Sequence, residues 1–200
     1  MDLLAHSTHA RSASSRSAGF TLIELVVTLL ILGVLAAAVI PRFMDSRISA
    51  HESSVKAVGG AFATAVQMVH GQWQVNGAVP NADDVQGFGQ NDVDVNANGW
   101  PTATNGNNSI PAGNAGRNQC SALLRTLLQN GPSVSLLRPE PGLFISSAYA
   151  FSGPPHDPAA DYWATASANQ CTFEYRPVAN LSFSYYCLTG TVVIDDDAGS

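Results

Sequence analysis

The sequence predicts an α+β fold in which a long N-terminal helix lies over a C-terminal antiparallel sheet. Three observations carry this prediction. A nearly uncharged apolar run covers residues 20–40, an apolar stripe of helical period follows it, and short segments of alternating apolar and polar residues fill the last part of the chain. A helix laid over a meander of about four or five strands gives two layers around one core.

The first element is the apolar run 20–40, whose 21 residues contain a single charge, Glu24. A helix of this length measures about 31 Å, and the hydrocarbon core of a membrane is roughly 30 Å thick. A carboxylate in such a segment is unfavourable, by ~2.5–3.5 kcal/mol for Asp at the membrane centre. The run therefore predicts a transmembrane segment in which Glu24 needs a compensating partner.

The second element is an amphipathic helix that follows Pro41. Proline removes one backbone donor, so it should bend the helix rather than end it. Gly59-Gly60 is a further weak point, at about 1 kcal/mol per glycine relative to alanine, and Asn76-Gly77 ends the helix. The apolar stripe has spacings of three, four and seven residues and consists of Met44, Ile48, Val55, Val58, Phe62, Val66, Val69 and Trp73.

The N-terminal residues predict an exported protein. Residues 1–19 carry Arg11 and Arg16 but no apolar core, whereas a secretory signal peptide has its apolar region before the cleavage site. The arginines should stay cytoplasmic, which leaves the chain after residue 40 outside the cytoplasm. The predicted organisation is a leader (1–19), a long helix (20–76) and an exported head (77–200), the head comprising a connection (77–142) and a sheet (143–195).

The connection contains a partial calcium-binding pattern. Asp94, Asn96 and Asn98 stand at alternate positions before a glycine, as in the first half of an EF-hand loop. The carbonyl of Trp100 would be a fourth ligand. The bidentate glutamate expected at residue 105 is Asn105, and no pair of helices flanks the loop. A weak calcium site and a network of Asn-Gly turns therefore both remain open.

The rest of the head predicts one short helix and several strands. The helix covers 118–130, where apolar residues recur before Asn130-Gly131-Pro132. The strand candidates alternate apolar and polar residues or are rich in aromatic and β-branched residues. They are 144–149, 162–166, 171–176, 181–187 and 191–194, with turns at 168–169 and 188–190.

Three cysteines in an exported domain predict one disulfide and one remaining thiol. The pairing Cys120–Cys171 is favoured because it ties the helical part of the head to the sheet. A loop of that length corresponds to roughly 4 kcal/mol of chain-entropy stabilisation. Cys171–Cys187, between two neighbouring strands, is the alternative.

Composition and motifs argue against two function classes. The net charge of −6 and the acidic head offer no basic footprint for nucleic acid. The five histidines are scattered without metal-pair spacing, and the sequence has neither a G-x-S-x-G elbow nor a nucleotide-binding loop. The chain is therefore predicted not to be an enzyme.

Gly19 followed by Phe20-Thr21-Leu22-Ile23-Glu24 resembles the processing site of type IV prepilins and of type II secretion pseudopilins. The resemblance implies cleavage after Gly19 by a prepilin peptidase and methylation of the new N-terminus at Phe20. It implies that Glu24 pairs with the terminal ammonium of a neighbouring subunit during assembly. Gly33 and Pro41 fall where pilins kink their long helix.

Short phrases at 98–101, 127–132 and 162–164 resemble the longer pilins of the MSHA (mannose-sensitive haemagglutinin) type. The resemblance implies a major or minor structural subunit of an extracellular pilus used in surface attachment. Its partners would be other pilin subunits and the inner-membrane assembly machinery, and before assembly it would sit in the inner membrane with its head in the periplasm. The alternative is a pseudopilin of a type II secretion system. No cofactor is expected, with calcium left open because some secretion pseudopilins bind it in this connecting region.

Overall fold

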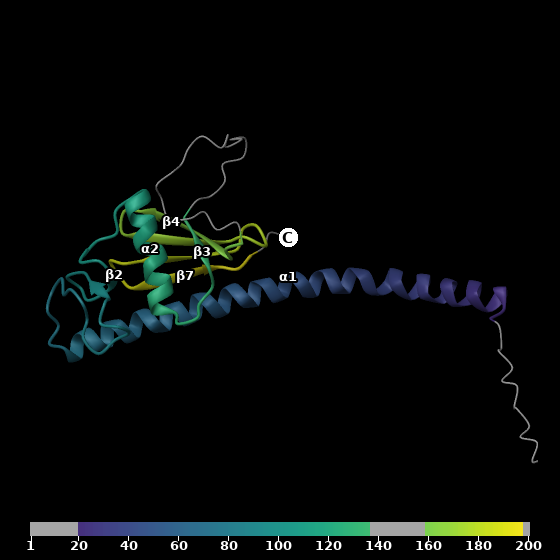
Figure 1. The fold of residues 1–200 in the computed structure, drawn as a ribbon, viewed down its shortest axis with the longest axis horizontal. Coiled ribbons are helices and arrows are strands. Elements are labelled where there is room, and N and C mark those ends of the chain that lie inside the picture. Colours follow the sequence, from purple (N-terminus) through teal and green to yellow (C-terminus); the bar gives the residue numbers. More distant parts are fainter. Residues whose placement is uncertain (1–19, 137–158, 198–200) are drawn as a thin grey trace, which may run out of the picture. The chain divides into compact units, whose positions relative to one another are not determined.

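The computed structural model describes residues 20–136 and 159–197. The chain divides into two compact units, Met1–Met44 and Asp45–Ser200. Helix α1, Leu22–Val75, begins in the first unit and ends in the second. Among the described residues, helix α2 and all the strands belong to the second unit (Figure 1). The α+β fold predicted from the sequence is confirmed.

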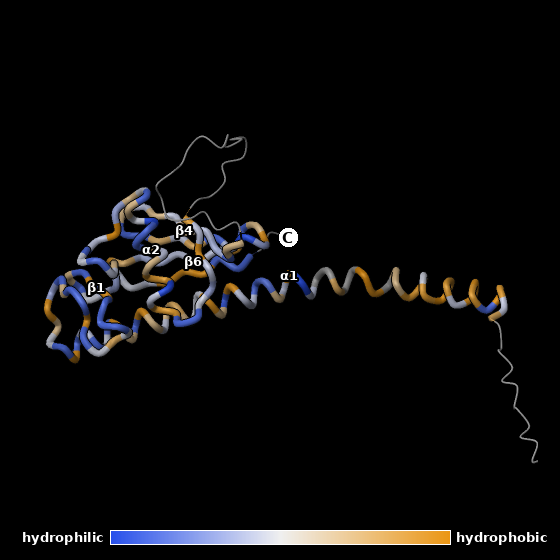
Figure 2. The backbone as a smooth tube through the Cα atoms, viewed as in Figure 1, coloured by the Kyte–Doolittle hydropathy of each residue, from blue (hydrophilic) through white to orange (hydrophobic). Residues whose placement is uncertain are grey.

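Helix α1 forms where the two successive apolar patterns predict it. It continues through Gly33 and Pro41 without interruption, and the bend expected there stays a prediction. Figure 2 shows that hydrophobic residues dominate the N-terminal part of the helix. The helix ends at the expected glycine, because Gly77 has φ 95° and the N–H of Ala78 donates to the Trp73 carbonyl at 3.0 Å.

Five strands form one sheet in the order β3-β4-β5-β6-β7. Strands β4 to β7 pair antiparallel with their neighbours, so four of the predicted strands are confirmed. The turn between β4 and β5 is tight because Asn169 takes φ 60°. The predicted strand 144–149 lies outside the described residues. The bounds are β3 Val134–Ser135, β4 Tyr162–Ser167, β5 Gln170–Tyr175, β6 Ser182–Tyr186 and β7 Thr191–Asp195.

Among the described residues, three strands, β1 to β3, were not predicted from the sequence. β3 pairs parallel with β4, so the sheet is not purely antiparallel. β1, Asp94–Val95, pairs antiparallel with β2, Pro101–Ala103, inside the connection that shows no periodic pattern. Each of these strands has two or three residues, which is too short for a period of two to be visible.

Helix α2, Asn114–Leu127, differs from the predicted range 118–130. It begins four residues earlier, after Gly113 at φ 79°. Gly116 in its first turn lies so close to the Pro111 carbonyl that a Cβ would sit 1.8 Å from that oxygen. The helix ends earlier because Leu128 is extended. The predicted bounds were wrong because this glycine-rich start carries none of the usual capping side chains.

The core lies between the sheet and the two helices. Phe62 of α1 contacts three aromatic rings of the sheet, those of Phe173, Phe183 and Tyr185, at centroid distances of 5.5–5.8 Å. All four side chains are fully buried, together with Val55, Val66 and Val69 of the same stripe. The stripe is therefore confirmed from residue 55 onward, whereas Ile48 is 44% exposed and is not part of the core.

A disulfide joins Cys120 of α2 to Cys171 of β5, the pairing favoured from the sequence. Both cysteines are fully buried, so the bond fixes α2 on the sheet from inside the core. Cys187 is a buried free thiol. Burial raises the pKa of its thiol to about 11, so little thiolate exists at neutral pH and the group is unreactive.

Helix α1 approaches the sheet closely at Gly59. A Cβ on this residue would lie 2.9 Å from Cγ1 of Ile194 and 3.4 Å from Cβ of Phe183. A Cβ on Gly60 would meet nothing within 4 Å. The two glycines are therefore not equivalent, although the sequence makes them look like one weak point in the helix.

We predict opposite effects for alanine at these two positions. Gly60→Ala should raise the free energy of unfolding by ~0.5–1 kcal/mol through helix propensity and reduced freedom of the unfolded chain. Gly59→Ala gains the same stabilisation, but its methyl group has to displace Ile194. Overpacking of this kind lowers the free energy of unfolding by ~1–3 kcal/mol. Denaturant unfolding of the full chain in detergent measures both changes. Equal stabilisation by both substitutions would show that the helix does not approach the sheet this closely.

Candidate functional site

The start of α1 is built by a side-chain cap that the sequence analysis missed. Gly19 lies outside the described residues, and Phe20 and Thr21 precede the helix. The backbone N–H of Glu24 donates to Oγ1 of Thr21 at 3.3 Å, which is the reach of an N-cap side chain to the third helical residue. Thr21 and Glu24 also have the spacing of a capping box, a sequence signal that could have been found.

Glu24 thus has a local structural role beside its expected role in assembly. It lies in the first turn of α1, where the positive end of the helix dipole favours a carboxylate by ~0.3–1 kcal/mol. This gain is smaller than the several kcal/mol that an apolar environment imposes on the charge. Among the described residues, the carboxylate has no hydrogen-bond or ion-pair partner. The helix start therefore leaves most of the charge to be compensated by a group outside the described residues.

Around Glu24 the helix surface is apolar apart from the hydroxyls of Thr21 and Thr28. Every large apolar side chain between residues 20 and 40 is exposed, from 42% for Val39 to 80% for Leu22. The hydroxyl of Thr28 donates to the Leu25 carbonyl at 2.8 Å and is satisfied within the helix. An exposed apolar surface of this extent marks an interaction site.

A helix that spans a membrane must be long enough and apolar enough to cross the hydrocarbon core. Within the part of the chain that the structure describes, no helix is sufficiently long and apolar to cross a membrane.

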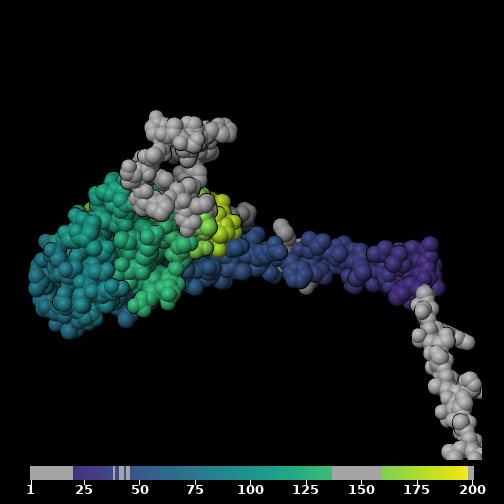
Figure 3. Space-filling view, viewed as in Figure 1, coloured from purple at the N-terminus to yellow at the C-terminus, as the bar shows by residue number. Residues whose placement is uncertain are grey.

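Asp94, the first predicted calcium ligand, is a fully buried carboxylate that organises the connection. Its Oδ1 accepts the backbone N–H of Asp84 at 3.1 Å, and its Oδ2 accepts those of Asn105 at 2.8 Å and Gly106 at 2.6 Å. Three chain segments therefore meet at one side chain. In the space-filling view the connection, in teal, forms a continuous surface with α2 (Figure 3).

The other predicted ligands also make internal hydrogen bonds. Oδ1 of Asn96 accepts the N–H groups of Asn98 and Trp100, and the Trp100 carbonyl accepts the N–H of Asn96. The amide of Asn98 donates to the Leu188 carbonyl at 3.4 Å. To bind calcium, the oxygens of Asp94, Asn96 and Trp100 would have to give up or share these bonds, whereas Asn98 uses only its amide nitrogen. Calcium binding stays a prediction of the sequence, and the described residues hold no cluster of three His, Cys, Asp or Glu side chains.

Beside this loop, the rings of His70 and Trp73 on α1 pack with the ring of Trp100 in the connection. The ring of His70 stacks on Trp100 at 4.0 Å and lies 5.3 Å from Trp73. Nδ1 of His70 donates to the Gly99 carbonyl at 3.1 Å, which fixes the proton on that nitrogen because a carbonyl only accepts. A Cβ on Gly99 would lie 2.1 Å from the Trp73 ring. Sequence reasoning missed His70 because its partner is 29 residues away.

Comparison with known proteins agrees with the motif at the start of α1. Residues 14–40 match the family model described as the prokaryotic N-terminal methylation motif. Over 98 residues the chain is 35% identical to a fimbrial protein of Neisseria meningitidis, which covers 46% of this chain and 57% of the relative. It is 36% identical over 70 residues to the type IV narrow pilus major component PilA5 of Thermus thermophilus, covering 35% and 58% of the two chains.

A third relative is the type IV major pilin protein PilE1 of Neisseria gonorrhoeae, 37% identical over 93 residues, with 43% of this chain and 56% of the relative covered. The chain thus spans less than three fifths of the length of these relatives. No solved structure has significant similarity to it. The start of the chain thus carries the methylation motif, and part of the chain is similar to pilins of type IV pili.

Proposed function

We propose that this chain is a structural subunit, major or minor, of an extracellular type IV pilus of the MSHA type, used in surface attachment. The observation that carries the proposal is the apolar first part of α1. Its large side chains are all exposed and lie around one carboxylate that has no partner among the described residues. Such a surface is unfavourable in water and becomes favourable when neighbouring copies cover it. The pilin relatives support the same function.

Assembly begins, in this proposal, with processing of the leader. A prepilin peptidase cuts after Gly19 and methylates the new amine of Phe20. The subunit then waits in the inner membrane with its head in the periplasm, until the inner-membrane assembly machinery moves it into the filament. The inner-membrane stage is supported by the apolar sequence of residues 20–40 and by the arginines that precede it.

The driving interaction is the pairing of Glu24 with the Phe20 ammonium of a neighbouring copy. Two opposite charges 4 Å apart attract by about 4 kcal/mol at an effective dielectric constant of 20. This is comparable with the several kcal/mol that the carboxylate loses in an apolar environment. The pair therefore makes the filament a better environment for Glu24 than the lipid bilayer.

Processing is tested by intact-mass measurement. Protein from assembled filaments should have a chain starting at Phe20 and carrying one methyl group on the terminal amine. Gly19→Val should block the cut and leave the full-length chain in the membrane fraction. Assembled material that retains residues 1–19 would contradict the proposal.

Glu24→Ala tests the assembly contact. We expect unchanged or increased membrane insertion and at least a tenfold lower content of the variant in sheared filaments relative to the membrane pool, because about 1.4 kcal/mol corresponds to a factor of ten. Thr21→Ala is the matched control, since it removes the helix cap and keeps the carboxylate. The control should assemble close to normally.

Two outcomes would contradict the assembly role. If the Glu24→Ala protein enters filaments as well as the parent chain, the carboxylate is not the assembly contact. If Thr21→Ala reduces assembly to the same extent, the role of Glu24 is confined to the helix start. Processed protein that never reaches surface filaments would favour the alternative, a pseudopilin of a type II secretion system.

A further inference from the structure

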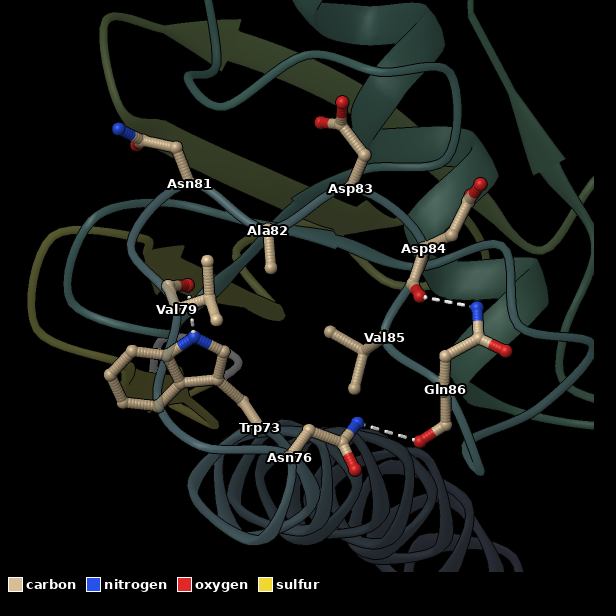
Figure 4. Close-up of a pocket in the computed structure, with 9 residues that line it drawn as sticks. All are labelled: Trp73, Asn76, Val79, Asn81, Ala82, Asp83, Asp84, Val85 and Gln86. Atoms are coloured by element: carbon tan, nitrogen blue, oxygen red, sulfur yellow. Dashed lines mark hydrogen bonds between the residues drawn. The ribbon is translucent and has the colours of Figure 1, made fainter.

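A hollow of about 370 Å³ lies where α1 ends and the connection begins. Figure 4 shows Trp73 at one side of it, with the side chains of Val79, Ala82 and Val85 gathered around its centre. The indole nitrogen of Trp73 donates to the Val79 carbonyl at 2.7 Å, so the ring is fixed as a wall. The hollow is lined by Trp73, Asn76, Val79, Asn81, Ala82, Asp83, Asp84, Val85 and Gln86.

The polar groups of the hollow are nearly all engaged with one another. The amide of Asn76 donates to the Gln86 carbonyl at 2.8 Å, and the amide of Gln86 donates to the Asp84 carbonyl at 2.9 Å. The exceptions are the amide of Asn81 and the carboxylates of Asp83 and Asp84, whose side chains have no hydrogen-bond or ion-pair partner among the described residues. In Figure 4 these two carboxylates lie on the rim and point away from the apolar centre.

The charges around the hollow all favour a cation. Asp83 and Asp84 are negative, the lining includes no Lys, Arg or His, and the C-terminal end of a helix carries a partial negative charge. An aromatic wall adds attraction for a cation, most strongly for a guanidinium group. A ligand with an apolar stem and a positive head therefore matches the hollow, with the stem against the apolar centre and the head at the rim.

Among the described residues, Arg47 is a side chain of this kind that is exposed and has no hydrogen-bond or ion-pair partner. Among the described residues, Lys56 forms an ion pair with Asp196, Arg125 donates to the Val134 carbonyl, and Arg176 lies over the ring of Trp163. Arg47 on α1 is exposed and makes none of these contacts. It precedes the end of the helix by 28 residues, which is about 42 Å.

We propose that Arg47 of one copy inserts into the hollow of a neighbouring copy in the filament. This inference rests on the proposed function. In a filament whose copies all point the same way, Arg47 of one copy meets the hollow of another copy, so the contact is head-to-tail. Contacts of this type generate open helical filaments. Each subunit makes the contact twice, once through Arg47 and once through its own Asp83 and Asp84.

Charge reversal in the full chain tests the contact. Arg47→Glu should lower the filament content, relative to the membrane pool, by about fivefold or more, the factor expected from losing an exposed ion pair at the strong end of the measured range. The double variant Asp83→Arg/Asp84→Arg should have a similar effect. The combination of all three substitutions should restore assembly. Asp195→Arg, an exposed acid on β7, is the control and should leave assembly unchanged.

Disulfide trapping gives an independent readout. A chain carrying both Arg47→Cys and Asp83→Cys should form a ladder of covalent multimers when filaments are oxidised, whereas either single variant should not. The inference is overturned if the reversals assemble normally, if their combination fails to restore assembly, or if no ladder forms. Absence of the parent chain itself from filaments would instead overturn the proposed function, so the two failures are distinguishable.

Discussion

The apolar surface at the start of α1 is the constraint on which the rest of the molecule depends. Large apolar side chains are exposed from Phe20 to Ile40, and nothing in the described residues of the first unit covers them. Farther along the same helix, Val55, Phe62, Val66 and Val69 are fully buried against the sheet. The second part of the helix is thus stabilised within the chain, whereas the first part needs surroundings that the described residues do not supply.

The second unit is built to hold its part of α1 firmly. Gly59 lets the helix approach the sheet, the aromatic cluster around Phe62 fills the space beside it, and the disulfide ties α2 to β5. The connection is fixed twice more, by the buried carboxylate of Asp94 and by the stack of His70 on Trp100. A rigid head of this kind presents its surface groups in fixed positions, as a repeated contact between copies requires.

The sequence predicted the features that depend on regular period. The buried stripe of α1 and the strands β4 to β7 follow from spacing alone, because side-chain direction repeats along a helix or strand. The motif at Gly19-Phe20 and the charge of Glu24 were also visible, as was the favoured disulfide. The motif, the charge and the periodic patterns are local in sequence or repeat within it, whereas the disulfide joins residues 51 positions apart and was only the favoured one of two pairings.

The features that the sequence left undetermined depend on residues brought together by folding. Asp94 looked like a calcium ligand because its spacing fits, whereas the structure places three backbone N–H groups around it. From the sequence, Gly59 looked like a weak point in the helix. Its contact with Ile194 could not be seen there, because the two residues lie 135 positions apart. The early start of α2 and the short strands β1 to β3 are set by such contacts rather than by period. The proposed contact of Arg47 with the hollow also joins residues that are distant in sequence, in this case residues of two copies.

The central claim is that copies of this chain cover one another's apolar helices. Helical reconstruction by electron cryomicroscopy of filaments sheared from cells tests it most directly. The account predicts that residues 20–40 of neighbouring copies bundle along the filament axis, with each Glu24 carboxylate about 4 Å from the Phe20 nitrogen of another copy. Filaments in which residues 20–40 face solvent, or in which Glu24 lies far from every terminal amine, would contradict it.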